Sequence, residues 1–193
     1  QLDSLVELKT ARCWDGYTGL TVPGGTTDVP AHLAESADGT FWGILDGATE
    51  DRVGYVRAAH IDPLRCTVEQ FPLNPFLKKV KPSATEINGS LAFKLDEKNE
   101  CLWMGAYGPG LFRFSLKTHE WRMYDLSPEG NSDPLHSFVY DIQHKNDSTL
   151  WLATQKGLKV FSIPQGRWTG FEAQPPRTWN AQPAIHQSVF RDR

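Results

Sequence analysis

The feature that most constrains the fold is a repeat marked by tryptophan. In each copy a strand-like stretch ends in a polar turn, and an apolar residue followed by a tryptophan begins the next stretch. The copies occupy residues 34–43, 95–105 and 143–153. Their tryptophans, Trp42, Trp103 and Trp151, are 61 and 48 residues apart. A repeat of roughly 20–50 residues is typical of solenoids and propellers, and the longer first interval indicates an insertion.

The residues after each tryptophan repeat as well. Each is followed by a glycine-containing turn and an apolar run, at residues 53–56, 111–114 and 158–161. A polar turn and a short aromatic stretch come next, clearly at residues 121–124 and 168–171 and more weakly at 68–71. Short alternating runs between turn residues predict strands, and the chain has no long run with helical spacing. One repeat therefore predicts four antiparallel strands in up-and-down order.

Four-stranded sheets repeated along a chain are the blades of a β-propeller. The sequence thus predicts an all-β chain forming a single propeller segment over residues 1–193. Residues 8–17 resemble residues 116–124, and residues 186–190 resemble residues 136–140, so both ends fall inside blades. We expect three complete blades at about 29–72, 88–125 and 137–172, a partial blade at 1–20, and the start of a further blade at 185–193.

Three blades do not make a closed ring, because propellers usually close with about 4–8 blades. An open segment would leave a large apolar face exposed at each end, and such faces indicate missing partners. We therefore expect the remaining blades to come from the same chain, beyond this sequence, or from another chain. A third arrangement would join the two partial ends into one fourth blade, although that blade would lack its second strand.

The second and third repeats resemble the two-component regulator propeller repeat. The residues that carry this resemblance are 102–114, 121–124, 137–142, 150–154 and 157–161. The resemblance implies the ectodomain of a periplasmic bacterial sensor, including hybrid sensors for oligosaccharides, or a freestanding propeller. Residues 34–71 resemble the streptogramin-lyase type of propeller repeat equally well.

Composition excludes several classes of function. The net charge is −3, which gives no sign of a nucleic-acid partner, and no apolar run approaches the ~18 residues of a membrane span. The three cysteines have no CxxC spacing, so a zinc site is not expected. No catalytic motif or phosphate-binding glycine loop is present. We therefore assign no catalytic residue, no metal ligand and no cofactor.

Candidate ligand-binding residues come from the repeat positions. His136 and His186 both stand just before the first strand of a blade. His32 occupies the repeat position that Asp141 occupies in the third blade. Loops that enter first strands open near the propeller axis, where imidazoles from several blades could converge, although solvated loop histidines are the simpler interpretation. Aromatic rings can stack on sugars. The candidate residues are His32, His136, His186, Asp141, Tyr107 and Trp179.

Three hypotheses about function follow. The first is a periplasmic or extracellular sensor propeller that binds a small polar ligand such as an oligosaccharide. The second is a metal-assisted lyase or hydrolase with a histidine and a divalent metal near the axis. The third is a structural propeller whose open blade edges bind other proteins.

Overall fold

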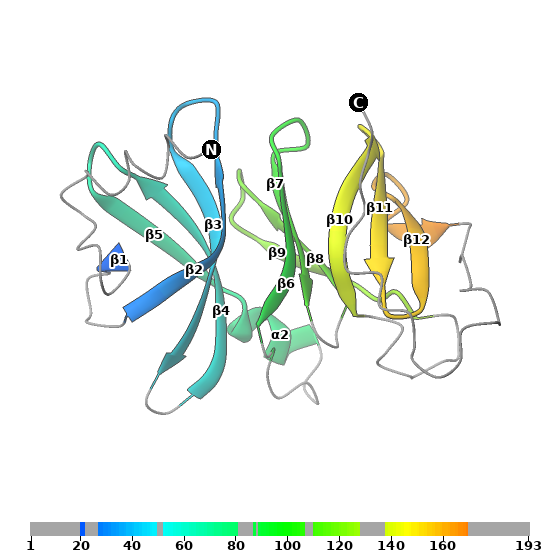
Figure 1. Cartoon of the computed structure of the whole chain (residues 1–193), viewed down its shortest axis with the longest axis horizontal. Helices are drawn as coiled ribbons and strands as arrows, with labels where there is room; N and C mark the ends of the chain where they lie inside the picture. Colours follow the sequence, from blue (N-terminus) through cyan, green and yellow to red (C-terminus); the bar gives the residue numbers. More distant parts are fainter. Residues whose placement is uncertain are drawn as a thin grey trace, which may run out of the picture. The chain divides into compact units, whose positions relative to one another are not determined.

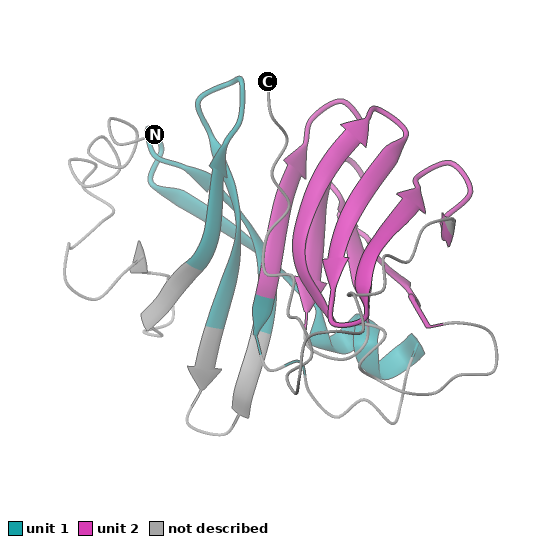
Figure 2. Ribbon diagram, turned by 45° about the vertical axis from the view of Figure 1, so that its right-hand side comes forward, with its two compact units in different colours: residues 1–90 teal, residues 91–193 magenta. Residues whose placement is uncertain are grey.

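The computed structural model describes residues 20–21, 27–49, 52–80, 87, 89–106, 110–127 and 138–169. The chain divides into two compact units, residues 1–90 and residues 91–193 (Figure 2). The predicted all-β fold is confirmed: three antiparallel sheets are each built from strands that follow one another in the chain (Figure 1). The expected division into complete and partial blades remains a prediction.

The first unit contains one sheet with strand order β1-β2-β3-β4-β5. Its strands are β1 (Leu20–Thr21), β2 (Thr27–Glu35), β3 (Phe41–Thr49), β4 (Arg52–Asp62) and β5 (Thr67–Pro72). The repeat tryptophan Trp42 stands near the start of β3, opposite Ala34 on β2 and His60 on β4. The polar turn before it is formed by residues 36–40, where Gly39 adopts a φ of 81° that favours glycine.

A short helix, α2 (Asn74–Val80), follows β5 in a link that contains no strand pattern. Pro75 lies in the first turn, where its missing N–H costs no hydrogen bond, and Lys78 and Lys79 lie in the last turn. Leu77 is buried and anchors the helix. The sequence did not predict this helix, because seven residues are too few to show a helical period.

The second unit contains two four-stranded sheets with the orders β6-β7-β8-β9 and β10-β11-β12-β13. The strands of the first are β6 (Ser90–Asp96), β7 (Cys101–Ala106), β8 (Leu111–Ser115) and β9 (Trp121–Tyr124). Those of the second are β10 (Val139–Asn146), β11 (Thr149–Thr154), β12 (Gly157–Ser162) and β13 (Arg167–Thr169). Trp103 and Trp151 occupy equivalent positions on the second strand of each sheet, opposite Arg113 and Val160 respectively.

Side chains from both sheets form one hydrophobic core in the second unit. Trp103 is fully buried, with its ring centroid 5.6 Å from that of Phe161 on the other sheet. Tyr124 packs on the same Phe161 ring at 4.9 Å. Complete burial of each large apolar side chain stabilises the fold by about 1.5–3 kcal/mol, so this shared core holds the two sheets together.

Gly105 on β7 sets how closely the two sheets approach. A β-carbon at this position would lie 2.6 Å from the carbonyl oxygen of Val139 and 2.7 Å from its Cβ. Only glycine therefore lets the first residue of β10 pack directly on β7.

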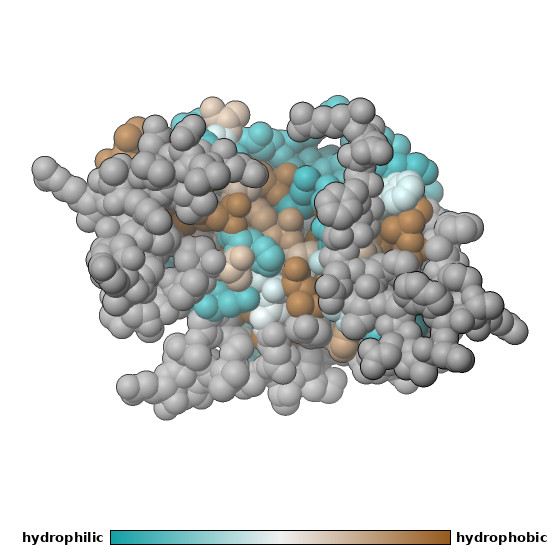
Figure 3. Space-filling view, viewed as in Figure 1, coloured by the Kyte–Doolittle hydropathy of each residue, from teal (hydrophilic) through white to brown (hydrophobic). Residues whose placement is uncertain are grey.

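Strand β12 alternates between buried and half-buried residues, whereas β7 is buried along its whole length. In the first unit Phe41, Leu45, Ala59 and Ile61 form a smaller core on one face of the sheet. Figure 3 shows hydrophilic and hydrophobic residues side by side on the described part of this face. The candidate sites below are built from turns and from strands.

Candidate functional site

Two of the six predicted ligand residues lie in the described part of the chain. His32 is half-buried on β2 in the first unit, and Asp141 is half-buried on β10 in the second. Asp141 stands in the first strand of its four-stranded sheet, and His32 stands in the second strand of a five-stranded sheet, after the short β1. Tyr107, His136, Trp179 and His186 lie outside the described residues.

Asp141 belongs to a polar row that links the first strands of the two sheets in the second unit. Its Oδ1 accepts hydrogen bonds from the backbone N–H of Ile142 at 2.8 Å and from Nε2 of Gln143 at 3.4 Å. Oε1 of Gln143 in turn accepts from Nζ of Lys94, on β6, at 3.5 Å. We call Lys94, Asp141 and Gln143 the inner-strand row.

The inner-strand row combines the groups that a hydroxyl-rich ligand needs. Lys94 offers an ammonium donor, Asp141 a carboxylate acceptor, and Gln143 an amide that both donates and accepts. All three side chains are half-buried. The two contacts within the row, at 3.4 and 3.5 Å, are near the limit of a hydrogen bond, so a ligand could replace them at small cost.

The sequence analysis named Asp141 as a ligand candidate and did not name Lys94 or Gln143. A signal was available, because both are polar residues in the middle of first strands, where an apolar residue is expected. Nothing in the repeat indicated that their side chains would meet across two sheets.

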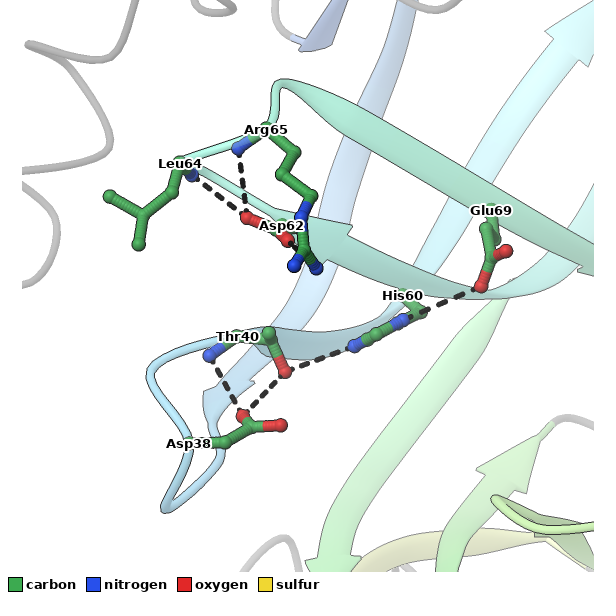
Figure 4. Close-up of polar contacts among 7 residues, drawn as sticks. All are labelled: Asp38, Thr40, His60, Asp62, Leu64, Arg65 and Glu69. Atoms are coloured by element: carbon green, nitrogen blue, oxygen red, sulfur yellow. Dashed lines mark hydrogen bonds and ion pairs between the residues drawn. The ribbon is translucent and has the colours of Figure 1, made fainter.

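A second polar group lies at one end of the sheet in the first unit (Figure 4). The Thr40 hydroxyl lies 2.7 Å from Oδ1 of Asp38, and Nε2 of His60 lies 3.0 Å from the same hydroxyl oxygen. On the other side of the imidazole, Nδ1 lies 3.5 Å from Oε2 of Glu69. We call Asp38, Thr40, His60 and Glu69 the edge chain.

Local structure explains why these four side chains meet. Asp38 and Thr40 come from the turn between β2 and β3, His60 stands near the end of β4, and Glu69 faces it from β5. The His60 ring stacks on Trp42 at 4.4 Å, which fixes its plane. Hydrogen bonds from the backbone N–H and the side chain of Thr40 lower the pKa of Asp38, so this carboxylate stays ionised at neutral pH.

The edge chain contains a hydroxyl, an imidazole and a carboxylate, which are the groups of a nucleophilic hydrolase. The Thr40 hydroxyl donates to Oδ1 of Asp38 at 2.7 Å, and Nε2 of His60 lies 3.0 Å from the hydroxyl oxygen. The hydroxyl hydrogen is thus held by the ionised carboxylate, which is a strong acceptor. The edge chain therefore acts as a clamp between the turn and the strands.

The neighbouring turn between β4 and β5 is fixed in a similar way. Oδ1 of Asp62 accepts from the backbone N–H groups of Leu64 and Arg65, both at 2.9 Å, and the Arg65 guanidinium lies 3.1 Å from its other oxygen. The hydrogen bond from the backbone N–H of Arg65 is the main reason why the pKa of Asp62 is lowered.

A third polar group joins the two sheets of the second unit. The buried carboxylate of Asp96 accepts from Nε1 of Trp103 at 3.1 Å and from Nδ2 of Asn99 at 2.8 Å. Nε2 of His144, on β10, lies 3.6 Å from the same carboxylate. Nearby, Lys98 pairs with Asp147 and lowers its pKa. These contacts connect equivalent turns of consecutive sheets, so they stabilise the packing.

Among the described residues, no group of three or more histidine, cysteine or acidic side chains could hold a metal ion. None of the described helices is long and apolar enough to cross a membrane.

The chain is similar to known proteins in part of its sequence and in its fold. No protein-family model matches the sequence. A 77-residue stretch, 40% of the chain, is 27% identical to histidine kinase P4 of Formosa agariphila. That stretch covers 6% of the kinase, so the chain spans only a small part of the length of this relative.

Solved structures show similarity in fold. The extracellular domain of a putative hybrid two-component system from B. thetaiotaomicron matches 92% of this chain and 18% of its own, with a TM-score of 0.51 and 15% identity. A gluconolactonase from Xanthomonas campestris matches 81% of this chain and 52% of its own, with a TM-score of 0.53 and 13% identity. The resemblance seen in the repeat is confirmed: the chain is similar in sequence to a histidine kinase and in fold to the extracellular domain of a hybrid two-component system.

Proposed function

We propose that this chain is part of an exported sensor propeller that binds a small polar ligand such as an oligosaccharide. The observation that carries the proposal is the sequence similarity to a histidine kinase over 77 residues of the chain. The fold similarity to an extracellular domain of a hybrid two-component system supports the same role. A sensor needs a ligand site and a way to report its occupancy, and this chain supplies candidates for the first.

The inner-strand row is the proposed ligand site. First strands of propeller blades surround the central channel, so Lys94, Asp141 and Gln143 would face a ligand near the axis. His32 has the same repeat position as Asp141 and is proposed to contribute from its own blade. Tyr107, His136, Trp179 and His186 remain proposed ligand residues from the loops.

Export is supported by cysteine chemistry. Cys66 is disulfide-bonded, while Cys101 is a buried free thiol. Disulfides persist in oxidising compartments and are rare where glutathione keeps thiols reduced. This supports a periplasmic or extracellular location.

Calorimetric titration of the folded chain with a panel of oligosaccharides tests the proposed site. We expect Asp141→Asn and Gln143→Leu to weaken binding of a responding glycan about tenfold each, which corresponds to about 1.4 kcal/mol. Asp147→Asn is the matched control, because this carboxylate is exposed in a turn away from the row, and it should bind like the unaltered chain. A well-folded chain that binds no glycan, or equal affinity in all three variants, would contradict the proposal.

A further inference from the structure

We propose that one face of the last sheet is the docking surface for a further blade, and that residues 186–190 of this chain form the first strand of that blade. The face is formed by Trp151 and Ala153 on β11 and by Leu158 and Val160 on β12. We call it the Trp151 face. This proposal concerns architecture and does not depend on the ligand.

Strand geometry places these residues on one side of the sheet. Leu150, Leu152 and Phe161 point into the core that the last sheet shares with β6–β9. Successive side chains of a strand point to opposite faces, so Trp151 and its cross-strand neighbour Val160 point away from that core. Of the four residues of this face, Ala153 is buried, and Trp151, Leu158 and Val160 are half-buried.

The preceding sheet shows what happens to the equivalent face when a partner is present. Trp103 is completely buried, packs on Phe161 of the next sheet and donates its indole N–H to Asp96. Gly105, two residues further along β7, lies directly against Val139. The face that carries the repeat tryptophan is therefore covered by the sheet of the next repeat, and the first strand of that sheet makes the closest approach.

Among the described residues, Trp151 has no equivalent of the acceptor that Asp96 provides for Trp103. Its indole nitrogen is shielded from solvent, yet it has no hydrogen-bond acceptor among the described residues. The ring is approached by Nζ of Lys145, 6.0 Å from its centroid, on the same sheet. A shielded N–H without an acceptor is unfavourable, so the geometry around Trp151 fits a donor whose partner belongs to an adjoining blade.

The sequence identifies the segment that would cover the face. Residues 186–190 repeat the pattern of residues 136–140, which lead into β10, and they follow the last sheet in the chain. This repeat position places Val189 where Val139 stands in the preceding repeat. Residues 186–190 lie outside the described part of the structure. We infer that Val189 packs on Ala153, as Val139 packs on Gly105.

A pair of introduced cysteines tests this contact. Cβ atoms at Gly105 and Val139 would be 2.7 Å apart, and the Ala153 methyl group requires a somewhat wider approach, near the ~3.5–4.5 Å of a disulfide. We expect A153C with V189C to form an intrachain bond under mild oxidation. Mass spectrometry would detect it between tryptic peptides 146–156 and 178–191. The matched control is A153C with S188C, whose second residue faces the other way, and it should give at least about tenfold less product.

Equal cross-linking in both pairs, or none in either, would overturn the proposal. A disulfide found only between two molecules would also overturn it, because a second copy would then cover the face.

A measurement without new cysteines guards against misfolded variants. Hydrogen exchange at residues 158–162 should become faster in a chain ending at residue 184 than in the full chain, while residues 101–106 should not change. Unchanged exchange at residues 158–162 would contradict docking by the C-terminal segment.

Discussion

At the scale of single residues, the three repeat tryptophans share a position but differ in environment. Trp42 stacks on His60, Trp103 donates its N–H to Asp96, and Trp151 finds no acceptor in the described part of the chain. The cause lies in the neighbours, because the residue opposite the tryptophan is His60 in one sheet and Val160 in another. The shared repeat position therefore fixes where the ring lies, and the neighbouring residues decide what its polar atom contacts.

Replacing Asp96 tests how much one buried acceptor contributes. Asp96→Ala leaves the indole N–H of Trp103 and the amide of Asn99 without their acceptor, so we expect the free energy of unfolding to fall by about 2 kcal/mol. Urea denaturation monitored by tryptophan fluorescence measures the change. Asp147→Ala is the control, because an exposed ion pair contributes little. A similar loss in both variants would show that the buried hydrogen bonds are not responsible.

Cys101 gives a prediction about reactivity. Burial raises the pKa of its thiol to about 11. At pH 8 only about one thiol in a thousand is then ionised, so alkylation by iodoacetamide in the native protein should be far slower than in urea. Peptide mass spectrometry quantifies the modification at this position.

The same shift has a consequence for stability. Because the folded-state pKa of Cys101 lies above the ordinary value of 9.0, the unfolded chain ionises first as the pH rises. The contribution of this thiol to stability is complete below pH 9 and is lost progressively between about pH 9 and 11. Cys101→Ala should remove that part of the pH dependence, and an unchanged pH profile in this variant would contradict the assignment.

At the scale of elements, the local sequence pattern accounts for the strands of the sheets. Packing between distant residues accounts for the short helix α2 and for the close approach at Gly105. Short alternating runs separated by turn residues predicted β6–β9 and β10–β13 well, because strand alternation and turn chemistry are local properties. The helix α2 escaped prediction since its stability comes from burying Leu77. Gly105 lies within β7 where another strand approaches, and the local pattern alone does not show this contact.

The close approach at Gly105 is testable by paired substitution. Gly105→Ala places a methyl group within 3 Å of Val139, so we expect the free energy of unfolding to fall by about 1–3 kcal/mol. Combining it with Val139→Gly should make the two changes less than additive, because space is created where the methyl group is added. Chemical denaturation of both single variants and the double variant gives the coupling. Strictly additive losses would mean that the two residues do not compete for space.

At the scale of the whole molecule, the sheets of the second unit are joined by both an apolar core and a polar group. The core around Trp103 and Phe161 supplies most of the stabilisation, because burial of large apolar side chains outweighs exposed ion pairs. The contacts of Asp96 and Asp147 fix how the two sheets are aligned, since they connect equivalent turns of consecutive sheets. In a propeller segment of this kind, the sheet of each added repeat covers one face of the sheet before it.

The sequence by itself determined the all-β fold, the four-strand unit and the positions of Trp42, Trp103 and Trp151, because these depend on residues close together in the chain. It also located Asp141 in a first strand. Only the tertiary structure decided that Lys94 reaches Gln143, that His144 approaches Asp96, and that His60 contacts Thr40. These contacts join residues 20 to 49 positions apart through the pairing of strands and sheets, and periodicity carries no information about which distant side chains meet.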